Sequence, residues 1–358
     1  MFTEQPHRLA GLDISGTPYE IGHALGRHGA AVAHGYLVRT HGWAAVTGFC
    51  DQPFMHRAHI LTQTRFPQFY EELRGLADGL ELPFDAVFAW NCRGDIRAMN
   101  PDGCTTVQLP GPSRVVAHNE DGDPGLRAGC ALATVRPRQG RRFTAFVYPA
   151  SIPGHTFSLN DAGVVMTVNN IRSLAGGDGL PRMVLTRALL DCGSTAQCVE
   201  MLETLPRSGG FHLTLARPVE ADSLSVEFTH GGLSVTPIVA PGAHANHLVH
   251  DAMRSAPQTV TQSSRARQVR ADSLIARAER HDAGLALEIL RDTQNKALPI
   301  FRTQPDDPDH ENTLASAVFT LGQDRVDCAV YDNTSSTPCF RFICRTEDDF
   351  VAPIPCHA

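Results

Sequence analysis

Residues 102–106, Asp-Gly-Cys-Thr-Thr, combine residue types that could carry out acyl chemistry. Gly103 has no Cβ, so it permits strained backbone angles and leaves its carbonyl open to approach. The thiol of Cys104 could attack that carbonyl and shift the chain from nitrogen to sulfur. Hydrolysis of the resulting thioester would leave Cys104 as a new amino terminus.

The new terminus would supply its own base. An α-amine has an ordinary pKa of roughly 7.7–8.0, which suits proton transfer at neutral pH. A thiol nucleophile beside its own amine needs no separate histidine. The same Gly-Cys pair is also compatible with a turn that leads into a buried small residue. In that alternative, Cys104 is a core thiol of a non-catalytic binding protein.

Three histidines offer a second kind of chemistry. His244, His247 and His250 form an H-x-x-H-x-x-H run, and on a helix this spacing places the residues near one face. However, a Pro-Gly pair precedes the run, and we expect a strand at 245–248, where alternation would scatter the three side chains. No glutamate follows the HExxH pattern. A zinc-dependent hydrolase that uses these histidines is therefore an alternative, and our prediction is a site without metal.

The elements that must position Cys104 change in character near residue 103. Thr17 and Pro18 are typical of a helix start, and amphipathic spacing predicts further helices at 56–80 and 84–91. After residue 104 the hydrophobic period drops to two, which indicates strands. The predicted strands cover residues 105–109, 114–118, 130–135, 143–148, 164–168, 211–215, 223–228, 233–238, 245–248, 314–321 and 327–331, and the predicted later helices cover 181–190, 195–205 and 264–280.

The order of these elements predicts the fold class. Strands, then helices, then strands again without βαβ alternation indicate an α+β domain with antiparallel sheets. Two sheets with helices on their outer faces would fit this order. The chain has no strong linker, so we expect one compact unit with a helical N-terminal part.

Composition limits the partners. Hydrophobic residues make up 42% of the 358 residues and charged residues 19%, which is typical of a soluble globular protein. The formal net charge of -7 argues against a surface for nucleic acid or an anionic membrane. The single lysine, Lys296, follows an asparagine, so the sequence has no Gly-Lys-Ser/Thr phosphate loop.

Cysteine usage and the first residues indicate the compartment. The ten cysteines are irregularly spaced and form no C-x-x-C pair, which favours free thiols in a reducing cytosol over a disulfide framework. Residues 1–20 contain three acidic residues and no apolar core, so no signal peptide is expected. The absence of an 18-residue apolar run argues against a membrane span. We therefore predict a cytoplasmic protein.

Several motifs, in order along nearly the whole chain, resemble the acyl-coenzyme A:6-aminopenicillanic acid acyltransferase family, the self-processing cysteine members of the N-terminal nucleophile (Ntn) hydrolases. The Asp-Gly-Cys-Thr-Thr sequence is followed by Ala-His-Asn-Glu-Asp at 117–121. The other matching motifs lie at 16–22, 72–79, 160–163, 167–170, 245–247, 264–270 and 313–316. The resemblance implies a four-layer αββα sandwich of two antiparallel sheets between helical layers.

The resemblance also implies the roles of the main site residues. Cys104 would be both the self-cleavage nucleophile and the acyl carrier. Asp121 would accept a hydrogen bond from the new α-ammonium or from an arginine. Arg267 would be that arginine, holding Asp121 through both carboxylate oxygens and lowering the pKa of the thiol. Arg265 and Arg270 are alternatives, because the register depends on the Ser-x-x-Arg spacing alone.

Further polar residues complete the implied site. Asn246 would donate its side-chain amide to the oxyanion of the tetrahedral intermediate, a contribution of about 3 kcal/mol. Asn169 or Asn170 could supply a second donor or bind substrate, and the sequence does not decide which of them faces the site. His118 and Asn119 are candidates for substrate contact, and a structural role is the alternative for each.

We therefore predict a self-processing cysteine amidohydrolase or acyltransferase that acts on a small N-acyl amide through a thioester on Cys104. Cleavage after Gly103 would give two fragments, 1–103 and 104–358, which stay associated. No cofactor is expected. Coenzyme A would be a substrate if the activity is the alternative one, an acyl-CoA-dependent N-acyltransferase. The expected partners are a small amide or acyl thioester; a homodimer is compatible with the sequence, and nucleic acid and membrane are not expected.

Overall fold

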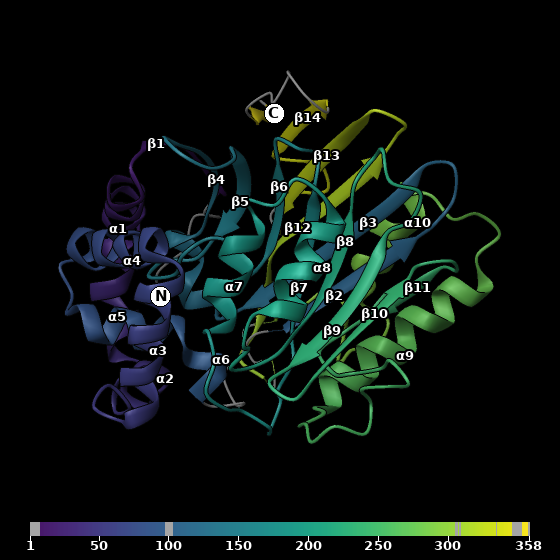
Figure 1. The fold of residues 1–358 in the computed structure, drawn as a ribbon. Coiled ribbons are helices and arrows are strands. Elements are labelled where there is room, and N and C mark those ends of the chain that lie inside the picture. Colours follow the sequence, from purple (N-terminus) through teal and green to yellow (C-terminus); the bar gives the residue numbers. More distant parts are fainter. Residues whose placement is uncertain are drawn as a thin grey trace.

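Two β-sheets form the centre of the molecule (Figure 1). The computed structural model describes residues 8–96, 103–304, 307, 309–333, 335–345 and 353–356, so Asp102 lies outside the described residues. The first sheet contains, in spatial order, β1 (Ala10–Gly16), β4 (Ala131–Pro137), β5 (Phe143–Val147), β6 (Phe157–Asn160), β7 (Val165–Asn170), β8 (Phe211–Ala216), β9 (Leu224–Thr229) and β10 (Gly232–Pro237). The second sheet contains β11 (Gly242–His244), β2 (Gly103–Leu109), β3 (Arg114–Gly122), β12 (Asn312–Leu321), β13 (Arg325–Asp332), β14 (Phe340–Arg345) and β15 (Ile354–Pro355).

Helices cover the outer faces of this pair of sheets. The helices that follow β2 in the chain are η2 (Pro124–Gly129), α7 (Arg182–Leu189), α8 (Thr195–Thr204), α9 (Gln262–Arg277) and α10 (Ala283–Leu290). α7 and α8 lie over the eight-stranded sheet, and α9 and α10 lie over the seven-stranded sheet (Figure 1). The layers therefore follow the order helices, sheet, sheet, helices, and the predicted α+β sandwich is confirmed.

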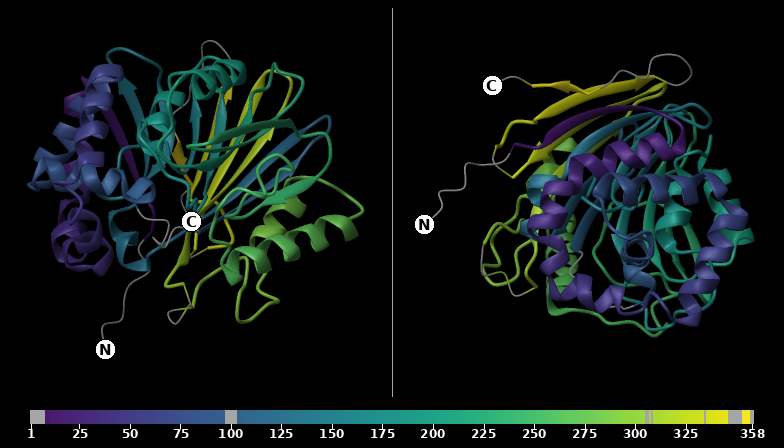
Figure 2. Two further views of the ribbon diagram at one scale, coloured as in Figure 1. Left: turned by 60° about the horizontal axis from the view of Figure 1, so that its bottom comes forward. Right: turned by 90° about the vertical axis from the view of Figure 1, so that its left-hand side faces the viewer.

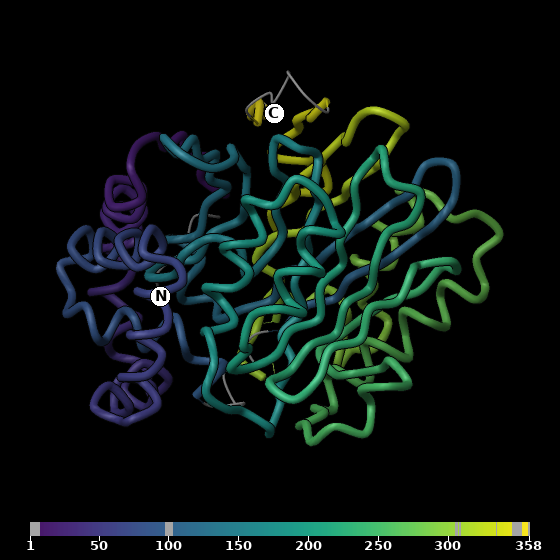
Figure 3. The backbone as a smooth tube through the Cα atoms, viewed as in Figure 1, coloured from purple at the N-terminus to yellow at the C-terminus, as the bar shows by residue number. Residues whose placement is uncertain are grey.

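The N-terminal helices form a group of their own. They are α1 (Pro18–Gly35), η1 (Leu37–Arg39), α2 (His41–Thr47), α3 (Pro53–Arg65), α4 (Pro67–Leu80), α5 (Phe84–Asn91) and α6 (Arg93–Ile96). They gather at one side of the sheets, where α1 packs on β1 and β4 (Figure 2). Figure 3 shows the backbone of these helices at one side of the strands.

The first helix begins where the sequence predicts it. The side chain of Thr17 accepts a hydrogen bond from the backbone N–H of Glu20 at 3.3 Å, and the Glu20 carboxylate accepts one from the backbone N–H of Thr17 at 2.7 Å. Pro18 occupies the first turn, where its missing N–H costs nothing. This reciprocal capping satisfies two backbone donors that the helix itself leaves without partners.

Glycines allow α1 and α4 to pack backbone to backbone. A Cβ atom added at Gly22 or Gly26 of α1, or at Gly75 or Gly79 of α4, would overlap backbone atoms of the other helix. Only residues without a side chain permit this approach. The motifs at 16–22 and 72–79 therefore have a packing function.

The alternation of β2 places the site between two cores. Val107 and Leu109 pack with residues of α9 and α10 on one face of the strand. Thr106 points the other way, where its hydroxyl donates to Asn169 Oδ1 of the opposite sheet at 2.7 Å. Because side chains alternate along a strand, Cys104 lies on the same face as Thr106, between the two sheets.

Several elements differ from the prediction, and β6, α10 and β14 were not predicted. β1 lies within the part of the chain predicted as helical and pairs with β4 in parallel, whereas the other strand pairings described are antiparallel. The helix predicted at 56–80 is two helices, because Pro67 starts a new one. The segment 245–248 is not a strand, because its polar groups bind side chains instead of a neighbouring strand.

Among the described residues, no helix combines the length and apolar character needed to cross a bilayer.

Candidate active site

Gly103 and Cys104 form the start of β2 and pair with Asp121 and Glu120 of β3. Both residues are buried, and the side chain of Cys104 is 3% exposed. A Cβ atom at position 103 would overlap the carboxylate of Glu311. A side chain at position 103 would therefore displace the buried Glu311 carboxylate, and glycine avoids this.

Arg267 holds the backbone of Cys104 from the outer face of the sheet. Its guanidinium donates to the backbone carbonyl of Cys104, to Thr105 Oγ1 at 2.9 Å and to Asn246 Oδ1 at 2.7 Å. Its Nε also donates to Ser263 Oγ at 3.2 Å, one turn earlier in α9. The side chain is 1% exposed. The rigid fork of a guanidinium suits this arrangement, because it presents several donors in fixed directions.

Asn246 binds the other polar group of the Cys104 backbone. Its Oδ1 accepts from the Cys104 N–H at 2.9 Å, and its Nδ2 donates to the backbone carbonyl of Asn170 at 3.1 Å. The backbone N–H of Asn246 itself is held by Ser264 Oγ at 2.9 Å. We expected the side-chain amide of Asn246 to face an oxyanion. In the uncut chain the carbonyl oxygen faces Cys104 instead, because the two nearest groups, the Cys104 N–H and Arg267, are both donors.

The thiol of Cys104 lies among groups that act on it in opposite directions. Burial, and then the nearby Glu120 side chain, raises the pKa of Cys104 well above its ordinary value. The backbone N–H of Asn170 and the charge of Arg267 oppose this shift, because they stabilise the thiolate. At neutral pH the sulfur is therefore a protonated thiol.

Asp121 lies beside Gly103, but its side chain is not paired with Arg267 as predicted. Its Oδ1 accepts from Thr313 Oγ1 at 2.7 Å, whereas the hydrogen bonds of Arg267 go to the groups around Cys104. Burial raises the pKa of Asp121, and the charges of Arg267 and Arg302 oppose this shift. The two side chains thus interact through charge without the bidentate contact. The reason is the register, which places Asp121 opposite Gly103, one residue before the group that Arg267 binds.

The two asparagines at the end of β7 point in different directions. Asn169 is part of the polar layer between the sheets, because its Oδ1 accepts from Thr106 and His212 and its Nδ2 donates to the His244 carbonyl. Asn170 contributes backbone groups to the site, since its N–H faces the Cys104 sulfur and its carbonyl binds Asn246. Of the two, Asn170 is therefore next to the thiol.

Asn119 faces away from the thiol. Its side-chain amide donates to the Leu290 carbonyl in α10 at 2.7 Å, and its Oδ1 accepts from Ser316 Oγ at 2.6 Å. These bonds join β3, α10 and β12. Asn119 therefore has the structural role that we gave as its alternative.

His118 lies close to the thiol, in a group that the sequence does not reveal. Its Nε2 is 3.1 Å from Glu120 Oε2, and that oxygen is 3.8 Å from the Cys104 sulfur. The hydroxyl of Tyr148 donates to Glu120 Oε1 at 2.9 Å. Glu120 was missed because it occupies a variable position of its motif. Its spacing of two from His118 is the available signal, because it places both side chains on one face of a strand.

A second group of buried charges lies beside Gly103. Arg302, which is 1% exposed, forms ion pairs with Asp307 and Glu311, and Arg172 reaches Glu311 at 3.4 Å. Burial raises the pKa of Glu311 to about 7, although Arg302 and Arg172 act in the opposite direction. The sequence analysis missed this group, although Glu311 lies two residues before the Thr-Leu-Ala-Ser motif at 313–316.

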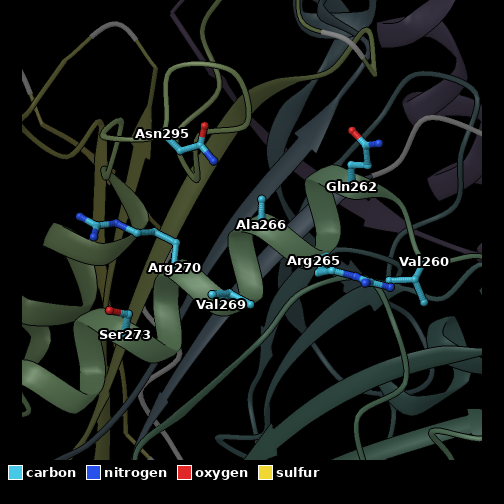
Figure 4. A pocket seen from close by; sticks show the side chains of 8 residues that line it. All are labelled: Val260, Gln262, Arg265, Ala266, Val269, Arg270, Ser273 and Asn295. Atoms are coloured by element: carbon cyan, nitrogen blue, oxygen red, sulfur yellow. The ribbon is translucent and has the colours of Figure 1, made fainter.

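The two alternative arginines of α9 lie on its outer side. Figure 4 shows Arg265 and Arg270 at the edge of a surface pocket of about 680 Å³, together with exposed Val269. Arg270 forms an ion pair with Asp292 at 2.6 Å. Of the three arginines considered from the sequence, Arg267 is the one beside Cys104.

The three histidines of the zinc alternative bind different groups, although His244 and His250 both lie beside Glu227. His244 Nε2 is 2.8 Å from Glu227 Oε1, and His247 Nδ1 is 2.8 Å from Ser264 Oγ. His250 binds Ser225 Oγ through Nε2 at 2.9 Å. Within the part of the chain that the structure describes, the three rings do not converge on one point as metal ligands. The only grouping of that kind among the described residues joins Cys104, His118 and Glu120, whose ligand atoms lie within 4.8 Å of one another.

A small cavity lies beside Tyr148. It has a volume of about 100 Å³, and its apolar lining includes Leu37, Trp90, Leu126 and Tyr148. Tyr148 is the link to the site, because its hydroxyl binds Glu120. Arg93, Asp123 and Ser151 supply polar groups to the same cavity.

A buried cysteine at the start of an inner strand, in a helix-covered sandwich of two sheets, is the arrangement of an Ntn-type hydrolase. The chain belongs to the acyl-coenzyme A:6-aminopenicillanic acid acyl-transferase family, whose sequence pattern matches residues 109–335. The resemblance stated from the motifs is thereby confirmed, and the description of the family is that of an enzyme, an acyl-transferase. Gly103 and Cys104 lie just before the matched region, and Asp121, Asn246 and Arg267 lie within it.

The chain is also similar to a β-alanyl-dopamine/carcinine hydrolase from Drosophila melanogaster. The two sequences are 25% identical over 241 residues, which is 60% of this chain. The matched part spans 59% of the length of that relative.

Proposed function

We propose that this protein is a self-processing cysteine amidohydrolase with Cys104 as its nucleophile. The observation that carries the proposal is the way the backbone of Cys104 is held. Asn246 binds its N–H and Arg267 binds its carbonyl, while the N–H of Asn170 faces its sulfur. Any buried residue needs partners for its backbone groups, but here both partners are side chains that also bind each other, and an N–H faces the sulfur as well.

The proposed reaction has two stages. First, Cys104 attacks the Gly103 carbonyl, and hydrolysis of the thioester separates residues 1–103 from residues 104–358. The new α-amine then occupies the position where the amide N–H bound Asn246, and it serves as the base of the mature enzyme. In each turnover an amide substrate acylates the sulfur and releases its amine, and water then removes the acyl group.

Small N-acyl amides are the proposed substrates. The cavity beside Tyr148 is small and partly apolar, with an arginine and an aspartate in its lining. The relative from Drosophila is named for two β-alanyl amides. We therefore propose β-alanyl-dopamine and carcinine as the first compounds to test, together with simpler N-acyl amides.

Intact-mass analysis tests the nucleophile and the cleavage position together. We expect the purified protein to give two fragments that divide at Gly103–Cys104, and the Cys104→Ala variant to give one uncut chain. Cys130→Ala is the matched control, because Cys130 is also a buried free thiol, and its sulfur donates to the Leu126 carbonyl, four residues earlier. An uncut wild-type chain, or a Cys104→Ala chain that is still cut, would contradict the proposal.

Activity assays of the purified protein distinguish hydrolysis from acyl transfer. Acyl transfer is the second candidate function, because the family description names an acyl-transferase. A hydrolase releases the amine from N-acyl amides in water alone. An N-acyltransferase requires an acyl-CoA thioester and an amine acceptor, and releases free coenzyme A thiol. Activity that a chelator abolishes in a chain that stays uncut would instead favour the zinc hydrolase.

A further inference from the structure

Self-cleavage needs a base other than the one that serves the mature enzyme. Before the chain is cut, the nitrogen of Cys104 belongs to an amide, and its N–H donates to Asn246 Oδ1 at 2.9 Å. An amide nitrogen in this state has no basic lone pair to offer. The thiol is nevertheless buried and protonated, so another group must take its proton during the first attack.

The side chains nearest the sulfur suggest which group this is. Cys104 and Glu120 are directly opposite each other in β2 and β3, and both point between the sheets. The Cys104 sulfur is 3.8 Å from Glu120 Oε2, and the same oxygen is 3.1 Å from His118 Nε2. All three side chains are almost fully buried. A thiol, a carboxyl and an imidazole thus follow one another within reach of proton transfer.

The surrounding hydrogen bonds fix which nitrogen of His118 carries a proton. Asn169 donates from Nδ2 to the His244 carbonyl, so its Oδ1 faces Thr106 and receives the Thr106 hydroxyl proton. Thr106 has no second proton, so its oxygen accepts from His118 Nδ1 at 2.8 Å. The other nitrogen of a neutral His118 is then an acceptor. Its contact with the Glu120 carboxyl therefore requires one proton that the two groups share.

We propose that the His118–Glu120 pair takes the proton of the Cys104 thiol when the chain cleaves itself. This inference depends on the proposed self-cleavage. Tyr148 orients the carboxyl through its 2.9 Å bond to Oε1, and Thr106 orients the imidazole. The pair holds one proton at the start and two after the thiol has lost its own, so the sulfur becomes a thiolate facing the Asn170 N–H.

The step balances in protons and bonds. The thiolate forms a C–S bond with the Gly103 carbonyl carbon, and the bond from that carbon to the Cys104 nitrogen breaks. The nitrogen must gain one proton to leave as an amine, and the proton held by the pair supplies it. Water then hydrolyses the thioester, which gives the Gly103 carboxylate and restores the thiol.

The competing interpretation of the same three side chains is a metal site, since a thiolate, an imidazole and a carboxylate are all metal ligands. The geometry favours the proton pair. Nε2 and Oε2 are at hydrogen-bond distance, and the other imidazole nitrogen is bound to Thr106. Cleavage that EDTA stops and added Zn²⁺ restores would overturn the proposed role.

The Glu120→Gln variant tests the proposal, because it keeps the shape of the side chain and removes its ability to accept a proton. Cleavage is followed by intact mass during cell-free synthesis of the full chain. We expect the rate to fall by about 100-fold or more, the usual contribution of a general base. Glu227→Gln is the matched control, since Glu227 and His244 form a second buried pair at 2.8 Å. The Glu227→Gln chain should be cleaved at the rate of the wild-type chain.

Hydroxylamine distinguishes the two steps of cleavage. It attacks thioesters, so the wild-type chain should give a fragment 1–103 that ends in a hydroxamate. Hydroxylamine should not speed the cleavage of Glu120→Gln, because formation of the thioester is the step that this variant slows. Rescue of its cleavage by hydroxylamine would overturn the proposal, because Glu120 would then act only in the hydrolysis.

Two further results complete the test. If Glu120→Gln does not fold, Tyr148→Phe removes only the hydroxyl that orients the carboxyl, and cleavage should slow by about tenfold. Cleavage of Glu120→Gln or Tyr148→Phe at the wild-type rate would contradict the role of the pair. An uncut wild-type chain would instead contradict self-cleavage itself, so the two failures can be told apart.

Discussion

Buried charges compensate one another around the peptide bond between Gly103 and Cys104. Arg267 and Arg302 approach it from the outer face of the seven-stranded sheet, with Asp121 and Glu311 beside them. Burying one such charge alone would be very unfavourable, so the site depends on their mutual compensation. Glu311 is nevertheless affected by its surroundings, because burial raises its pKa to about 7.

The raised pKa of Glu311 predicts how stability changes with pH. The folded protein retains the Glu311 proton up to about pH 7, whereas the unfolded chain releases it near its ordinary pKa of about 4.5. The unfolded state therefore binds fewer protons in this range, and its free energy falls relative to the folded state as the pH rises. The contribution is fully present below about pH 4.5 and is lost by about pH 7, with a total of about 3 kcal/mol.

Glu311→Gln removes this titration. Urea unfolding between about pH 4.5 and 8 should show that the stability difference between wild type and variant narrows or reverses as the pH rises, by about 3 kcal/mol. Glu288→Gln is the control, because Glu288 is exposed and pairs with exposed Arg280. A Glu311→Gln curve that runs parallel to the wild-type curve would show that Glu311 does not titrate in this range.

The site residues differ in how far the sequence reveals them. Cys104, Asn246 and Arg267 lie in motifs whose order along the chain is visible, and the structure brings them together. Glu120 and Tyr148 are 28 residues apart and meet because β3 and β5, which Tyr148 follows, belong to facing sheets. The packing of the two sheets decides such contacts, and no local pattern records it.

At the scale of elements, the α1–α4 contact depends on the absence of side chains. A Cβ atom at Gly79 would overlap the backbone carbonyl oxygen of His23, which cannot move without shifting the helix. We expect Gly79→Ala to lower the free energy of unfolding by about 1–3 kcal/mol, the range for overpacked interiors. Urea unfolding of the full chain measures this change.

The last residue of α1 provides the matched control. Gly35 is also helical, but a Cβ added there meets no other atom within 4 Å. Gly35→Ala should leave stability unchanged or raise it slightly, because alanine is the better helix former. Equal destabilisation by both substitutions would mean that helix propensity, and not the contact between the helices, sets the effect.

Local signals explain which elements could be predicted. The start of α1 follows from Thr17, Pro18 and Glu20, which lie within one turn, so the sequence is sufficient. β1 could not be found in this way, because its backbone partners lie in β4, more than 100 residues later. The strand predicted at 245–248 was wrong because Asn246 uses its backbone and side chain to hold Ser264 and Cys104.

At the scale of the molecule, the proposed cut divides the chain but leaves the contacts between its two parts. β1 completes the eight-stranded sheet through β4. In the core, Glu72 of α4 binds Arg187 of α7 through both carboxylate oxygens, and neither side chain is more than 3% exposed. We therefore expect fragments 1–103 and 104–358 to elute together on size-exclusion chromatography and to separate only in denaturant.

The Glu72–Arg187 pair should carry a large part of this association. Glu72→Gln leaves the buried guanidinium without a full counter-charge, which costs about 3–5 kcal/mol. The urea concentration at which the fragments separate should fall accordingly. Arg57→Gln is the control, because Arg57 and Asp178 also join the two parts at 2.8 Å but are 53% and 61% exposed, and such pairs contribute at most about 1 kcal/mol. The comparison of Glu72→Gln with Arg57→Gln is repeated in the uncut Cys104→Ala chain, where urea measures the stability of the intact fold. If Glu72→Gln lowers the urea midpoint only in the cut protein, the pair holds the fragments together without stabilising the intact fold.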